Sequence, residues 1–104
     1  MIIFNNKKDM KITWNVNYEL VKWVNKYFKL YKEVARKNIN LTFHKFNFEG
    51  EERTQLEMID IVIGLSEFLI KYQFEWDHDI LEELERTKNR FFNALSEVYW
   101  AMWW

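Results

Sequence analysis

The chain has 104 residues, of which 49% are hydrophobic and 30% charged, and this balance excludes an intrinsically disordered protein. This length suits one hydrophobic core, so we expect a single domain over residues 1–104. The absence of cysteine excludes disulfide scaffolds, thiolate metal sites and cysteine nucleophiles. A bias toward Phe, Tyr, Ile, Asn and Lys is typical of an AT-rich genome and suggests a low-GC bacterium, a phage or another mobile element.

Neither a secretory signal nor a membrane span is expected. At the N-terminus, an apolar run of only three residues precedes the charges, the wrong order for a signal peptide. The longest apolar stretch, 58–72, contains Asp60, Glu67 and Lys71. It is too short and too charged to cross a bilayer, and we therefore expect a cytoplasmic protein.

The first predicted element is a β-strand. Met10, Ile12, Trp14 and Val16 alternate with polar residues, which is the two-residue period of a half-buried strand. Residues 2–4 can pair with this strand, so an N-terminal hairpin is the simplest interpretation.

A long amphipathic helix is predicted next, from an N-cap at Asn17 to about Lys37. Its apolar residues occupy one half of the helical wheel. The centre of this half consists of Leu20, Val24, Tyr27, Tyr31 and Val34, with Val21, Phe28 and Ala35 on one edge and Trp23 and Leu30 on the other.

Residues 39–48 are predicted to form either a third strand or an extended connector, because apolar residues alternate there with one slip at residues 44 and 45. Thr54 and Glu57 then make a capping box that starts a second helix, expected to run to Phe74. The polar residues of this helix shrink to a narrow strip, so we expect it to pack on nearly all sides at the centre of the fold. The strip consists of Glu57, Asp60, Gly64, Glu67 and Lys71.

A third helix is predicted after Asp77 or Asp79, either of which can cap it, although one unbroken helix through His78 is the alternative. The expected buried stripe is Ile80, Leu84, Phe91, Leu95, Val98 and Met102. The predicted fold class is mainly α (α+β), with three long helices packed around a small N-terminal β-hairpin or short sheet.

The main candidate for function is a pair of tryptophans near the C-terminus. Trp100 and Trp104 lie on the otherwise polar face of the third helix, with Asn93 and Glu97. Exposed indoles four residues apart are typical of a protein-binding hot spot. The alternatives are that the N-terminal hairpin or a second copy of the chain, as in a homodimer, covers them.

Charge is unevenly distributed along the chain. Residues 1–48 hold ten basic and three acidic residues, net +7, whereas residues 49–85 hold two basic and twelve acidic residues, net −10. The cations of the first helix predict either nucleic-acid binding or simply a solvated face. They are Lys22, Lys26, Lys29, Lys32, Arg36 and Lys37, of which the first five are the predicted nucleic-acid-binding residues. Asp77 and Asp79 could attract a basic partner protein, or simply complement a helix dipole.

The sequence contains few residues that point to metal binding or catalysis. Asp77, His78, Asp79 and Glu82 contain nitrogen and oxygen ligand types, but no second cluster defines a metal site. The chain contains neither a nucleophile elbow nor a glycine-rich phosphate loop, so we expect no catalytic residues, no metal and no cofactor.

Together these features predict a non-enzymatic protein-binding module that acts by steric occlusion, as an inhibitor, adaptor or antitoxin-like regulator. Its predicted contact residues are Trp100, Trp104, Asn93, Glu97, Asp77 and Asp79. A nucleic-acid-binding regulator is the alternative, and a membrane surface is a less favoured partner.

Overall fold

The computed structural model describes residues 16–73 and 77–102. Its elements are α2 (Val16–Asn38), β1 (Lys45–Phe48), β2 (Glu51–Thr54), α3 (Gln55–Lys71), α4 (His78–Val98) and the short 3₁₀ helix η1 (Tyr99–Ala101). Three helices with one two-stranded antiparallel sheet confirm the mainly α (α+β) class. This sheet lies between α2 and α3 in the chain, whereas the residues of the expected N-terminal hairpin lie almost wholly outside the described part. Val16, the last of them, is helical.

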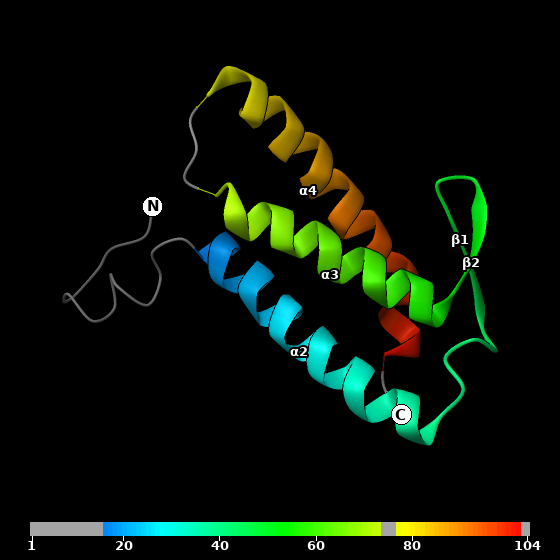
Figure 1. Cartoon of the computed structure of the whole chain (residues 1–104). Helices are drawn as coiled ribbons and strands as arrows, with labels where there is room; N and C mark the ends of the chain where they lie inside the picture. Colours follow the sequence, from blue (N-terminus) through cyan, green and yellow to red (C-terminus); the bar gives the residue numbers. More distant parts are fainter. Residues whose placement is uncertain (1–15, 74–76, 103–104) are drawn as a thin grey trace.

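The second predicted helix is the central one. Figure 1 shows α3 between α2 and α4, and it packs against both. Met58, Ile59 and Val62 on α3 are fully buried, while its predicted polar strip is exposed. α3 ends at Lys71, slightly before the expected end.

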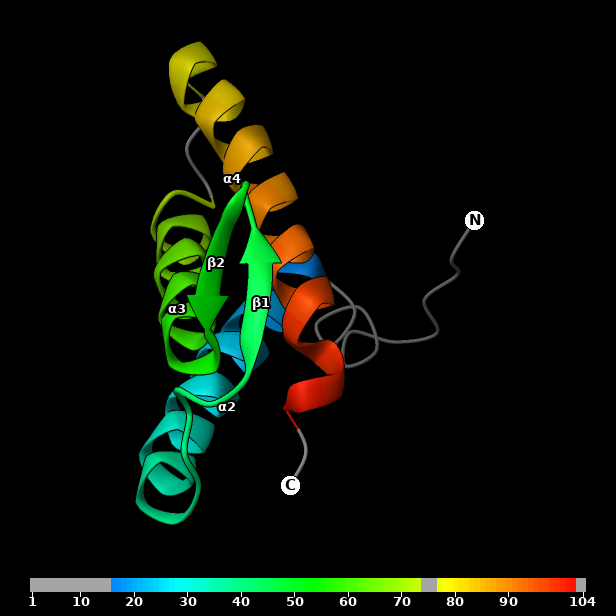
Figure 2. The same cartoon turned by 90° about the vertical axis from the view of Figure 1, so that its right-hand side faces the viewer.

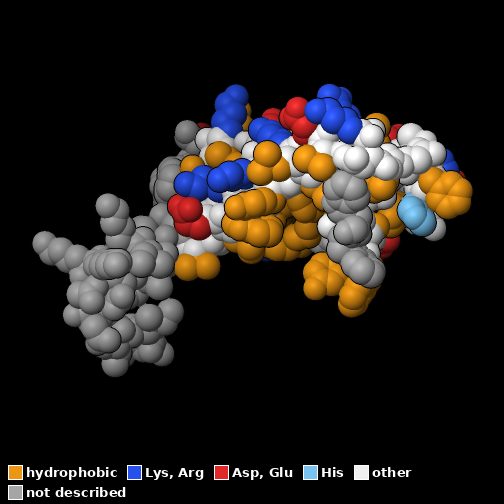
Figure 3. All heavy atoms as spheres, turned by 90° about the horizontal axis from the view of Figure 1, so that it is seen from below, with side chains coloured by type: hydrophobic (Ala, Val, Ile, Leu, Met, Phe, Trp, Pro, Cys, Tyr) orange, Lys and Arg blue, Asp and Glu red, His pale blue; other side chains and the backbone are white. Residues whose placement is uncertain are grey.

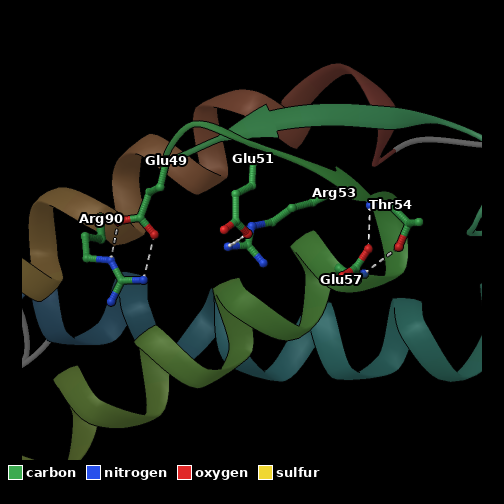
Figure 4. A network of polar contacts seen from close by, with 6 residues as sticks. All are labelled: Glu49, Glu51, Arg53, Thr54, Glu57 and Arg90. Atoms are coloured by element: carbon green, nitrogen blue, oxygen red, sulfur yellow. Dashed lines mark hydrogen bonds and ion pairs between the residues drawn. The ribbon is translucent and has the colours of Figure 1, made fainter.

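The capping box at the start of α3 is present as predicted (Figure 4). The Glu57 backbone N–H donates to Thr54 Oγ1 at 3.1 Å, and the Thr54 N–H donates to Glu57 Oε1 at 3.0 Å. These bonds satisfy two amides that a helix N-terminus would otherwise leave without partners.

The second and third helices are separate. Asp77 adopts an extended backbone and its carboxylate accepts from the Asp79 N–H at 3.1 Å, which starts α4 at His78. The predicted buried stripe of α4 is confirmed in part: Phe91 and Val98 are fully buried, and Leu84 and Leu95 pack partly buried against the core. Met102 also packs against the core but lies beyond the end of α4, and Ile80 in the first turn is only partly buried and is not part of the core cluster.

The hairpin covers one end of the helices, with β1 beside α4 and β2 beside α3 (Figure 2). Phe48 pairs with Glu51, so the loop contains only Glu49 and Gly50. Both have positive φ, 54° and 78°, as a tight hairpin turn requires. Arg90 of α4 donates twice to the Glu49 carboxylate, at 2.8 and 2.9 Å, and so fixes the turn against α4 (Figure 4).

The connector before the hairpin is only partly a strand. The Asn40 side chain accepts from both the backbone N–H and the hydroxyl of Thr42, which makes a local turn. This turn competes with a ladder, and the strand therefore begins at Lys45 rather than at Ile39.

α2 uses only part of its apolar half for the core. The residues that it buries are Val21, Val24, Phe28 and Ala35. Leu20, Tyr27 and Val34, at the centre of the predicted stripe, remain exposed instead. The apolar half of the wheel is wider than the surface that α3 and α4 cover, so α2 meets the core with one edge.

Candidate protein-binding surface

Trp100 is the candidate residue that the structure displays most openly. It lies in η1, directly after α4, and 79% of it is exposed. Its indole packs edge-to-face on the Tyr99 ring, with centroids 5.0 Å apart. Because the α-helix ends at Val98, Trp100 projects from a 3₁₀ turn rather than from the helical face that the sequence predicted. Trp104 lies outside the described residues.

A buried polar cluster holds η1 in place. Gln55 is 2% exposed, and its side-chain amide donates to the Ala101 carbonyl at 3.0 Å and to the Tyr31 hydroxyl at 3.3 Å. The Tyr31 hydroxyl also donates to the Ala101 carbonyl, at 3.3 Å. Burial raises the pKa of the Tyr31 hydroxyl above its ordinary value. Trp100 is therefore carried on an anchored backbone.

Trp100 stands between two hollows. One has a volume of about 660 Å³ and lies between α2 and the C-terminal segment, lined by Leu20, Trp23, Val24, Phe28, Leu95, Tyr99, Trp100 and Met102. The other, of about 630 Å³, lies toward the connector and β1. Phe43, which is 73% exposed, and Glu97 line this second hollow together with Trp100.

The first hollow opens onto a row of apolar residues that runs along α2, which we name the α2 stripe. Its members are between 43% and 58% exposed. They are Val16, Leu20, Trp23, Tyr27, Leu30 and Val34. Figure 3 views the molecule from the α2 side, and hydrophobic side chains gather across the middle of this face. Contiguous exposed apolar surface of this kind is typical of an interaction site.

The other predicted contact residues are not all brought together. Asn93 and Glu97 are exposed on α4, and Glu97 lies beside Trp100. Asp77 and Asp79 are also exposed, but at the opposite end of α4. Since Asp79 and Trp100 are 21 residues apart in sequence, a helical rise separates them by about 30 Å. The acidic turn and Trp100 are therefore two distinct surface regions.

The predicted basic face is largely occupied by ion pairs. Lys29 pairs with Glu67 at 3.0 Å and Lys32 with Asp60 at 2.6 Å, which joins α2 to the polar strip of α3. Lys22 pairs with Glu19 within α2. Lys26 lies over the Tyr27 ring, and Arg36 is exposed in the last turn. Such pairing reduces the positive charge available to phosphates.

The described residues offer no group of three or more metal-binding side chains, and the predicted ligand His78 has its side chain outside this part. Within the same ranges, no helix is both long and apolar enough to cross a membrane.

Sequence reasoning missed Tyr99, Phe43 and the exposure of the α2 stripe. The spacing of the stripe was a usable signal, because its members follow one another at intervals of four, three, four, three and four residues. The stripe could not be distinguished from the core face in the sequence, because core and stripe residues form one continuous apolar sector on the helical wheel. No family model, curated protein sequence or solved structure matches this chain, so the surface is interpreted from its own residues.

Proposed function

We propose that this chain is a non-enzymatic protein-binding module that acts by steric occlusion, as an inhibitor, adaptor or antitoxin-like regulator. Its contact surface is centred on Trp100 and includes Tyr99, Glu97 and Phe43. Trp100 carries the proposal: it is 79% exposed and projects from a backbone anchored by Gln55. Tryptophan and tyrosine dominate binding hot spots, and an anchored residue loses little conformational freedom on binding.

The test is affinity capture from an extract of the source cells, comparing the native chain with Trp100→Ala by quantitative mass spectrometry. Leu81→Ala is the matched control, because Leu81 is also an exposed α4 residue but lies near the other end of that helix. A partner should be retained by the native chain and the control and lost by Trp100→Ala. With the purified partner, Trp100→Ala should weaken binding by at least about 30-fold, as for a hot-spot residue.

Equal capture by the native chain and Trp100→Ala would contradict the proposal. Binding that depends instead on the cations of α2 would favour the nucleic-acid alternative, which has less support because three of those cations are paired with acidic residues. In a mobility-shift assay, that alternative requires binding that falls steeply with salt and is lost in a variant lacking Lys22, Lys26 and Lys29.

A further inference from the structure

The α2 stripe has the spacing of a helix that meets a second helix. Alternating intervals of three and four residues repeat across residues 16–34, and their average is the 3.5-residue period of knobs-into-holes packing. A helix of a monomer needs one buried face, and Val21, Val24 and Phe28 already provide it. At 100° per residue, the stripe lies about 100° around the helix from that face. It is therefore a second apolar seam, unused within the described residues.

The extent of the stripe suits a stable interface. Six side chains, each about half exposed, present on the order of 500 Å² of apolar surface, from the usual side-chain areas. Each partner contributes roughly 800 Å² to a standard interface, and somewhat more than half of that area is apolar, which is about the apolar area of the whole stripe. A surface of this size is in the upper part of the range for the largest apolar patch of a monomer, and patches of that size often mark interaction sites.

We infer that the partner of this seam is a second copy of the chain, with the two α2 helices antiparallel. In a parallel pair, the flanking charges Glu19, Lys26 and Glu33 would face the opposite flank of the other helix. That flank contains Val24 and Tyr31, which already pack in or against the core of their own chain. In an antiparallel pair, the charged flanks of both helices face each other, and oppositely charged residues can meet.

The charges also select the register. A fully aligned antiparallel pair places Lys26 opposite Lys26 and Glu19 opposite Glu33, so like charges meet. A shift by one heptad places Lys26 opposite Glu33 of the second copy, twice by symmetry. Among the described residues, neither Lys26 nor Glu33 forms an ion pair, whereas Glu19 is bound to Lys22. In this register Trp23 faces Val34 and Tyr27 faces Leu30, so a large side chain meets a smaller one in these layers. Leu20 faces Lys37, and Val16 lies beyond the end of the other α2 helix.

Trp100 is not a member of the seam, although it lines the same hollow as Leu20 and Trp23. The inferred dimer therefore goes beyond the proposed function and is tested separately. The experiment is sedimentation equilibrium over a concentration series. We expect the native chain to approach twice 13.1 kDa. Leu30→Lys should be a monomer, while Leu81→Lys, which alters another partly exposed leucine, should remain a dimer. Trp100→Ala should also remain a dimer, which distinguishes this result from the capture experiment.

Charge reversal tests the orientation. Lys26→Glu and Glu33→Lys should each weaken dimerisation by about tenfold, because two ion pairs become repulsive contacts. The double variant should recover most of the native affinity. All of these residues are exposed, and circular dichroism will verify that each variant is folded.

Failure of the double variant to recover would overturn the antiparallel register. A native chain that stays monomeric, or a folded Leu30→Lys variant that stays dimeric, would overturn the proposed dimer. In the first case, residues 1–15 or a different protein would have to be sought as the occupant of the α2 stripe.

Discussion

The two glycines of this chain differ in whether their position needs a glycine: the backbone at Gly50 favours one, and the surroundings of Gly64 do not require one. Gly50 has a φ of 78° in the hairpin turn, a conformation that side chains disfavour because of their Cβ atom. Gly64 lies within α3 on its exposed polar strip, and nothing lies within 4 Å of where a Cβ atom would be. The close approach that could explain a mid-helix glycine is therefore absent from the described part of the chain.

Gly64→Ala should increase the free energy of unfolding by about 1 kcal/mol, because alanine loses less backbone entropy in a helix. Gly50→Ala should decrease it by about 1 to 2 kcal/mol, because of its positive φ. Urea denaturation measures both. A destabilising Gly64→Ala would show instead that this face of α3 contacts something closely.

At the scale of elements, one ion pair joins the hairpin turn to α4, while Phe48 of β1 packs in the core. The Arg90 guanidinium holds the pKa of Glu49 below its ordinary value of 4.5, mainly through their hydrogen bonds. A lowered folded-state pKa means that the stabilisation is complete above the ordinary value and is lost as the pH falls through the folded one. The hairpin should therefore loosen in acid.

Glu49→Gln should reduce the free energy of unfolding at neutral pH by less than about 1 kcal/mol, as is usual for an exposed ion pair. It should also reduce the loss of stability between neutral pH and pH values below 4.5. Thermal denaturation over a pH series provides the measurement. Glu52→Gln is the control, since Glu52 is exposed in the same hairpin and forms no ion pair with the described residues. Equal pH dependence in the two variants would contradict the role of Glu49.

Local signals in the sequence predicted the helices well and the hairpin poorly. The capping residues Thr54 and Asp77 act through hydrogen bonds with residues two or three positions away, so the sequence contains both partners. The hairpin turn contacts Arg90, 41 residues away, and Glu-Gly is not one of the usual turn pairs. Trp100 was found because it interrupts a polar face. The α2 stripe was not found as a separate surface, because only tertiary packing decides which half of a wide apolar sector is covered.

At the scale of the whole molecule, stability depends on a thin core between three helices and the hairpin. Phe91 is fully buried at its centre, whereas the adjacent Phe92 is 42% exposed. The two rings contact each other, with centroids 5.1 Å apart. They therefore allow a buried and a partly exposed phenylalanine to be compared at nearly the same place in the structure.

Phe91→Ala should decrease the free energy of unfolding by about 3 to 5 kcal/mol through the cavity that it leaves. Phe92→Ala should cost less than half as much, because part of its ring already contacts solvent. Chemical denaturation of both variants provides the comparison. Similar losses would show that Phe92 is covered in solution.

The anchor of η1 has a consequence for how this protein could change its specificity. Gln55 and Tyr31 bind the backbone carbonyl of residue 101, an atom that every amino acid possesses. The side chains at positions 99 and 100 take no part in those hydrogen bonds, so new ones can be substituted there while the segment keeps its place. Under the proposed function, recognition would be encoded by the side chains of this short segment and its placement by its backbone. A library randomised at these two positions should yield folded proteins with new partners.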